Sequence, residues 1–156
     1  VLLNLMPIAT SSDKIYLSSE KKTEELAVKV SKKLKSGDII FLYGEMGVGK
    51  TTFIRYLVNS IQKENNLKQT EITSPTFNLL NEYQINKIKI DHYDLFRLKS
   101  DEDLKNLGLF EDSLNTITLI EWPEIIKEYP KNLIEFNFKY EKDHQTRSVQ
   151  IKGLNL

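Results

Sequence analysis

The stretch GEMGVGKT at residues 44–51 is the part of the sequence whose residue types and spacing most clearly indicate chemistry. It matches the pattern GxxxxGK(S/T), in which glycines let the backbone curl so that successive N–H groups point at phosphate oxygens. In this pattern Lys50 reaches the β- and γ-phosphates of a nucleotide, and the hydroxyl of Thr51 binds Mg²⁺. The competing interpretation is a glycine-rich turn that precedes a lysine by chance. Average residue frequencies predict such a match in about one chain in a hundred or fewer, so the sequence favours nucleotide binding.

The carboxylate of Glu121 is the candidate second anchor for the metal ion. Proteins with this loop, the P-loop, hold Mg²⁺ between the loop hydroxyl and an acidic side chain at the end of a neighbouring buried strand. The apolar run at 117–120 followed by Glu121 fits that description, and open α/β sheets bind ligands at the carboxyl ends of their strands. In isolation, an apolar run of this kind would more often be followed by a glutamate that is simply exposed to solvent. The presence of a P-loop in the same chain favours a role for Glu121 as a metal ligand. Trp122, the only tryptophan of the chain, could stack beside the nucleotide or cap the core, and its residue type favours the core.

A second acidic candidate is Asp94, in the stretch KIKIDHYDLFRL at 87–98. The two-residue alternation of a strand places Ile88, Ile90, His92 and Asp94 on one face and Asp91 on the other. Asp94 therefore ends a half-buried strand, where it could orient or deprotonate a water molecule, directly or through Mg²⁺.

Thr76 lies in the stretch ITSPTF at 72–77, in which Pro75 restricts Ser74 to extended geometry. This leaves Thr76 in a fixed loop between a helix and a strand, which is where γ-phosphate sensors lie in switch NTPases. An ordinary loop explains these residues equally well.

The elements around these residues predict an α/β fold. DIIFLY at 38–43 is typical of a strand buried on both faces, and apolar positions from 53 to 61 recur with helical spacing. An earlier helix is predicted to be capped by Thr23 and to end at Gly37, and a hairpin around 85–87 adds an antiparallel pair. The predicted architecture is P-loop NTPase-like, with a central, mostly parallel sheet, an antiparallel hairpin extension and helices on both faces. We expect one domain over residues 1–156, with 1–13 poorly ordered or peripheral.

Composition excludes several kinds of site. The 22 basic residues equal the 22 acidic ones in number, so the overall charge gives no reason to expect direct binding to nucleic acid or to an anionic membrane. The chain has no cysteine, which excludes disulfides and thiolate zinc sites. His92 and His144 are too far apart in the sequence to suggest a metal pair and are interpreted as ordinary fold residues. The apolar runs fall short of the roughly 20 residues that cross a bilayer, and the apolar start lacks the basic flank of a secretory signal, so we expect a cytoplasmic protein.

Five motifs, in the order GEMGVGKTT, SPTFNLLNEY, HYDLFRL, DLKNLGL and LIEWPE, resemble those of the TsaE (YjeE) family. The resemblance extends from about Thr23 to Pro123, with a weaker tail. It implies that ATP and Mg²⁺ are bound with Thr51 and Glu121 as the metal anchors, and that Lys50, Asp94 and Glu121 are the catalytic residues. The implied contacts of the loop with the nucleotide are Glu45, Met46, Gly47, Val48, Gly49, Lys50, Thr51 and Thr52.

The same resemblance implies roles at positions outside the loop. Thr76 falls in a switch-like motif of the family, and Trp122 falls beside its metal-binding glutamate. Family members close the nucleotide site with segments near both termini, which implies that Glu20, Thr23 and Arg147 lie near the base. Phe96 departs from the family pattern, which usually has tyrosine there, so this chain lacks that hydroxyl.

The activity implied by the resemblance is weak ATP hydrolysis that becomes useful only with the partner proteins TsaB and TsaD, in threonylcarbamoyladenosine modification of tRNA. The chain would reach tRNA indirectly, through that complex, in keeping with its balanced charge. A small-molecule kinase is one alternative, but its lid is usually rich in arginine and this chain has only Arg55, Arg97 and Arg147. A switch GTPase should carry an NKxD motif, which is absent. A nucleotide-dependent interaction module, with hydrolysis as a timer, is the closest rival.

Overall fold

A computed structural model describes residues 13–156, so the expectation about the first residues of the chain lies outside the described part except at Asp13. The strands are β1 (Ile15–Leu17), β2 (Ile39–Tyr43), β3 (Leu80–Ile85), β4 (Ile88–Asp94), β5 (Thr116–Glu121), β6 (Leu133–Tyr140) and β7 (Arg147–Lys152). The helices are α1 (Glu20–Ser31), α2 (Lys50–Glu64) and α3 (Asp101–Asn106), with 3₁₀ turns at Ser113–Asn115 and Pro123–Ile125. None of the helices within this part of the chain combines the length and hydrophobicity that a membrane span requires.

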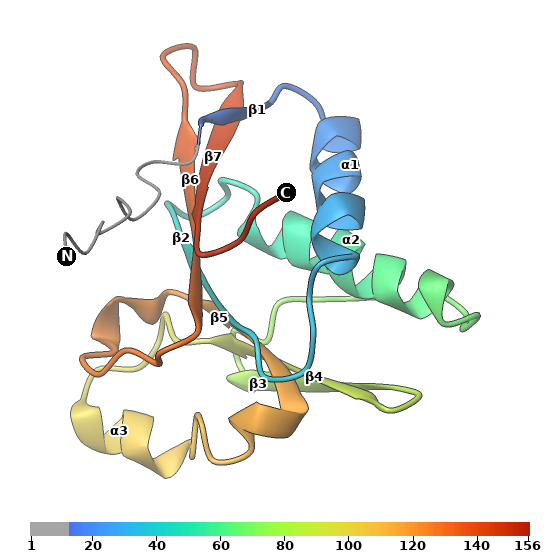
Figure 1. Ribbon diagram of the computed structural model, residues 1–156. Coiled ribbons are helices and arrows are strands. Elements are labelled where there is room, and N and C mark those ends of the chain that lie inside the picture. Colours follow the sequence, from blue (N-terminus) through green and yellow to red (C-terminus); the bar gives the residue numbers. More distant parts are fainter. Residues whose placement is uncertain (1–12) are drawn as a thin grey trace, which may run out of the picture.

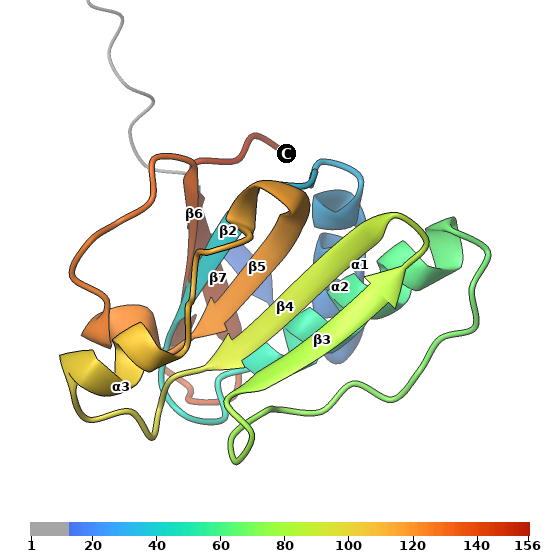
Figure 2. The same cartoon turned by 90° about the horizontal axis from the view of Figure 1, so that it is seen from below.

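The strands form one sheet in the order β1-β7-β6-β2-β5-β4-β3. Its four central strands, β6, β2, β5 and β4, pair in parallel. β3 runs antiparallel to β4 at one edge, which confirms the predicted hairpin, and Figure 2 shows this pair beside β5. At the other edge β7 and β1 add a second antiparallel extension, which the sequence did not predict.

The two long helices lie together on one face of the sheet, and α3 lies on the other (Figure 1). The apolar positions of α2 that recur with helical spacing are all buried, as predicted: Phe53, Ile54, Leu57, Val58 and Ile61. They pack in one core with Ile40 and Leu42 of β2. A smaller core on the opposite face joins Ile39 and Phe41 of β2 to Tyr93 of β4 under the segment that contains α3. The predicted α/β architecture with helices on both faces is confirmed.

Both predicted ends of the first helix are wrong. Ser19, in extended conformation, is the N-cap of α1 and accepts a hydrogen bond from the N–H of Lys22, so Thr23 lies within the helix and is buried. The helix therefore begins four residues earlier than predicted, because the side chain of Ser19 caps its first turn. At the other end the helix stops at Ser31, where the N–H groups of Lys33 and Leu34 both bond to the carbonyl of Val30. Gly37 instead lies in the turn before β2.

Candidate functional site: a phosphate-binding cleft

The loop between β2 and α2 has the backbone that phosphate binding requires. Gly44, Gly47 and Gly49 have φ values of +144°, +79° and +115°, in the region that favours glycine. Gly49 directly precedes α2 and offers no side chain to cap it. The first N–H groups of α2 are therefore available to an anion, and the helix dipole favours negative charge there.

Gly44 is also packed too closely for any side chain. A Cβ at this position would lie 2.8 Å from Cγ1 of Val48 and 2.9 Å from the carbonyl oxygen of Phe138. Gly44→Ala should therefore lower the free energy of unfolding by about 3 kcal/mol, because it adds steric overlap to backbone strain. Gly37→Ala is the matched control, since its φ is +99° but the nearest atom to its Cβ is 3.5 Å away, and its expected cost is about 1–2 kcal/mol. Urea unfolding measures both, and equal losses would show that the close packing around Gly44 has no effect.

A cleft of about 330 Å³ opens beside this loop. It is lined by Met46, Gly47, Gly49, Lys50, Thr51, Thr52, Ser74, Thr76, Asp94, Phe96, Glu121 and Trp122. The loop, the segment after α2, the end of β4 and the end of β5 thus meet at one place, although they are widely separated in the sequence. Of the predicted site residues outside the loop, Thr76, Asp94, Glu121 and Trp122 all line the cleft.

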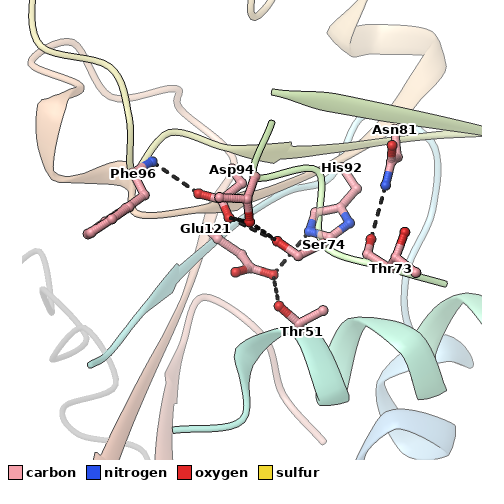
Figure 3. Close-up of polar contacts among 9 residues, drawn as sticks. Thr51, Thr73, Ser74, Asn81, His92, Asp94, Phe96 and Glu121 are labelled. Atoms are coloured by element: carbon pink, nitrogen blue, oxygen red, sulfur yellow. Dashed lines mark hydrogen bonds and ion pairs between the residues drawn. The ribbon is translucent and has the colours of Figure 1, made fainter. Parts of the chain in front are cut away.

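Glu121 and Thr51 form the part of the cleft that could hold a metal ion. Glu121 ends β5 and is only 3% exposed, and its Oε1 accepts a hydrogen bond of 2.8 Å from the hydroxyl of Thr51 (Figure 3). Carboxylate and hydroxyl oxygens are the ligands that Mg²⁺ prefers, and Mg²⁺ usually takes one or two carboxylates and completes its shell with substrate phosphates and water. Residues 13–156 contain no cluster of three His, Cys, Asp or Glu side chains that could hold a metal by themselves. The donor set therefore suits a magnesium ion that arrives with a nucleotide.

Asp94 lies beside Glu121 because the two residues are register partners on the adjacent parallel strands β4 and β5. Its Oδ2 accepts hydrogen bonds from the hydroxyls of Ser74, at 3.0 Å, and Thr76, at 3.2 Å. Its Oδ1 accepts the N–H of Phe96 at 3.0 Å (Figure 3). The carboxylate is thus held in place by three donors and in turn fixes the loop at 74–76 against the cleft. Ser74 was not among the predicted site residues, although it lies in the same short motif as Thr76.

Lys50 and Trp122 are in direct contact at the cleft. The ammonium of Lys50 donates to the carbonyl of Gly44 and lies 3.7 Å from the centroid of the Trp122 ring, a cation–π contact. Burial lowers the pKa of Lys50, and the nearby carboxylates of Glu121, Glu124 and Asp94 oppose that shift. Trp122 packs against the smaller core and also lines the cleft, so both interpretations of this residue hold in part.

The other predicted contacts are not among the residues that line the cleft. Val48 is buried in the core behind the loop, and Glu45 lies in the loop. Glu20 is bound to Arg55 and Tyr56, and Thr23 is buried in α1. Arg147 contacts the loop, with Nη2 3.5 Å from the carbonyl oxygen of Gly47. The predicted roles of Glu20, Thr23 and Arg147 near the base, and of Glu45 and Val48 as loop contacts with the nucleotide, stay predictions.

His92 is the neighbour of the site that sequence reasoning missed. It was interpreted as an ordinary fold residue, yet its Nε2 lies 3.0 Å from Oε1 of Glu121. The signal was present in the alternation of β4, which places His92 on the same face as Asp94. What the sequence did not show is that β5 pairs with β4, which brings Glu121 within reach of His92.

The chain is similar to known proteins over most of its length. A family model described as threonylcarbamoyl adenosine biosynthesis protein TsaE matches residues 17–149. A Rickettsia felis protein named tRNA threonylcarbamoyladenosine biosynthesis protein TsaE is 45% identical over 127 residues, which is 80% of this chain and 71% of that protein. The protein of the same name from Rickettsia typhi is 43% identical over 141 residues, or 89% of this chain and 94% of that one.

A solved structure supports the fold independently. The crystal structure of YdiB from Bacillus subtilis has a TM-score of 0.70 to this chain at 20% identity, and the similarity covers 92% of this chain and 86% of that one. The resemblance found in the five sequence motifs is therefore confirmed over most of the chain. These matches show that the chain belongs to the TsaE family, whose members are threonylcarbamoyl adenosine biosynthesis proteins.

Proposed function

We propose that this protein binds ATP with Mg²⁺ in the cleft and hydrolyses it slowly, in support of threonylcarbamoyladenosine formation in tRNA. The observation that carries the proposal is the hydrogen bond of 2.8 Å between the loop hydroxyl of Thr51 and the strand-end carboxylate of Glu121. It joins the two side chains that are proposed to hold Mg²⁺, which lie 70 residues apart in the sequence. A glycine-rich turn without a nucleotide would not need an acidic side chain buried against its hydroxyl.

The residues of the cleft have distinct roles in the proposed reaction. Backbone N–H groups of the loop and the start of α2 bind the phosphates, and Lys50 neutralises the charge that develops on them. Thr51 and Glu121 would hold Mg²⁺, which would neutralise further negative charge on the phosphates. Asp94, held by Ser74, Thr76 and Phe96, orients the attacking water.

The proposed partners are the proteins TsaB and TsaD, through which the chain would reach tRNA. The support is membership of the family, together with the equal numbers of acidic and basic residues. A protein that bound tRNA firmly by itself would be expected to show a basic face, because neutralisation of phosphates supplies most nonspecific affinity.

Reconstitution of tRNA modification from purified components tests this proposal. Modified adenosine should form with TsaB, TsaD, this protein and ATP together, and should be lost when this protein is left out or when a nonhydrolysable ATP analogue replaces the ATP that it hydrolyses. The threonylcarbamoyl donor is supplied preformed and free of nucleotide, so that the ATP or analogue added is the only one in the reaction. Full modification without this protein would contradict the proposal.

A nucleotide-dependent interaction module is the second candidate. The observation that favours it is the exposure of apolar side chains at the cleft, where Met46 is 65% and Phe96 is 49% exposed. Such a surface suits a partner that reads the state of the nucleotide. In that case the analogue would sustain modification as well as ATP does.

A further inference from the structure

Glu121, the proposed anchor for magnesium, has a second polar neighbour that comes from outside the loop. His92 lies within β4, two residues before Asp94, and its side chain is completely buried. Its Nε2 is 3.0 Å from Oε1 of Glu121, the same oxygen that accepts the hydroxyl of Thr51 (Figure 3).

The chemistry of the two groups determines which atom donates. An ionised carboxylate only accepts hydrogen bonds, and a neutral imidazole has a single N–H. Nε2 therefore donates to Glu121, and Nδ1 becomes an acceptor. Within residues 13–156 this Nδ1 is buried and has no hydrogen-bond partner, an arrangement that costs stability. An apolar side chain of similar size would fill the same space without that cost, which indicates that the ring serves a purpose through Nε2.

The two oxygens of Glu121 have different surroundings. Thr51 and His92 both donate to Oε1, whereas no side chain of the described residues donates a hydrogen bond to Oε2. The hydroxyl of Thr51 is itself an expected metal ligand, so its hydrogen bond cannot alone determine the orientation of the carboxylate. His92 approaches from the core side, where it has no access to solvent, and its position is fixed by the β4–β5 pairing.

We propose that His92 is a positioning residue for Glu121, which holds Oε1 so that Oε2 is presented to the magnesium ion of the bound nucleotide. This inference rests on the proposed function, because it gives Glu121 its task. Hydrogen-bond partners of metal-ligating carboxylates typically change metal affinity by about 10–100-fold when they are removed.

The test compares His92→Asn with His92→Gln. The amide of glutamine extends about as far from the backbone as Nε2 and can donate to Oε1, whereas the amide of asparagine ends near the position of Nδ1. Calorimetry measures Mg²⁺ binding to each protein saturated with a nonhydrolysable ATP analogue. His92→Asn should weaken Mg²⁺ binding by about 10–100-fold, whereas the Mg²⁺ affinity of His92→Gln should stay close to that of wild type. In EDTA, without Mg²⁺, both variants should bind the analogue with wild-type affinity. Thermal unfolding verifies that each variant is folded, and His92→Leu replaces His92→Asn if the latter is not.

The Glu121→Ala background separates positioning from a general structural role. There His92→Asn should cause no further loss of Mg²⁺ affinity, because the carboxylate that it orients is gone. Unchanged Mg²⁺ affinity in His92→Asn alone, or the same loss in both backgrounds, would overturn the inference while leaving the proposed function intact. Failure of the wild-type protein to bind the analogue with or without Mg²⁺ would instead refute the proposed function, and the inference with it.

Discussion

Replacing Lys50 with methionine should lower nucleotide affinity and the rate of ATP hydrolysis together, each by about 100-fold. In the proposed function the ammonium of Lys50 is the cation that faces the phosphates, and the charge on them grows in the transition state. Binding and rate therefore both depend on it. Methionine keeps most of the aliphatic length of lysine, so the contact with Trp122 loses its charge but little of its volume.

Lys50→Met should not lower stability, although it lowers activity. Burial lowers the pKa of Lys50, which means that the folded protein disfavours the charged form. Removal of that charge should leave the free energy of unfolding unchanged or higher. Lys63→Met, in the exposed last turn of the same helix, is the control and should change neither binding nor rate. Normal hydrolysis by Lys50→Met in the presence of the partner proteins would show that the loop has been assigned wrongly.

Asp94→Asn should leave ATP affinity near the wild-type value and slow turnover by about 100-fold. Asparagine has the size of aspartate but carries no charge and has only one oxygen, so it can neither accept a proton nor keep all three of the present hydrogen bonds. Because Asp94 lines the cleft but lies outside the loop at 44–51, the proposed binding of the nucleotide should not depend on it. Single-turnover kinetics and equilibrium binding of ATP measure the two effects separately.

Asp91→Asn is the matched control for this variant. Asp91 is also a buried aspartate of β4, but it lies on the opposite face of the strand, where its carboxylate is 3.7 Å from the ammonium of Lys89. It should change turnover little. An equal loss of affinity and turnover in Asp94→Asn would mean that Asp94 supports the loop at 74–76 rather than the chemistry. Modification sustained by Asp94→Asn despite slow hydrolysis would favour the nucleotide-dependent interaction module.

Much of the cleft could be predicted because its residues belong to strongly patterned segments. Gly44 to Thr51 form a motif with one known backbone shape, and the apolar runs before Glu121 and Asp94 place both carboxylates at strand ends. Parallel strands bring their carboxyl ends to the same edge, so two carboxylates that each end a parallel strand lie at the same edge of the sheet. The structure adds that they are direct register partners.

The features that were not predicted depend either on contacts between distant segments or on local patterns that fit more than one position. The hydrogen bond of His92 to Glu121 requires the strand order, which no local pattern encodes. The pairing of β1 with β7 joins residues that are 130 or more positions apart, and β1 has only three residues. The start of α1 was misplaced because Ser19 and Thr23 are both acceptable caps by residue type, and only the backbone conformation selects Ser19.

Because Asp94 and Glu121 are register partners, the distance between their backbones is insensitive to most amino-acid substitutions. The N–H of Leu95 donates to the carbonyl of Glu121 at 3.1 Å, so the ladder between the strands continues to the last residue of each. The separation of the two carboxylate-bearing residues is then the spacing of paired strands, about 4.8 Å, which depends on the main chain and is common to all sequences. Exchanges of side chains elsewhere in the core can accumulate without altering it. Only an insertion or deletion that slips one strand by a residue would separate the two carboxylates, and it would turn one of them to the far side of the sheet.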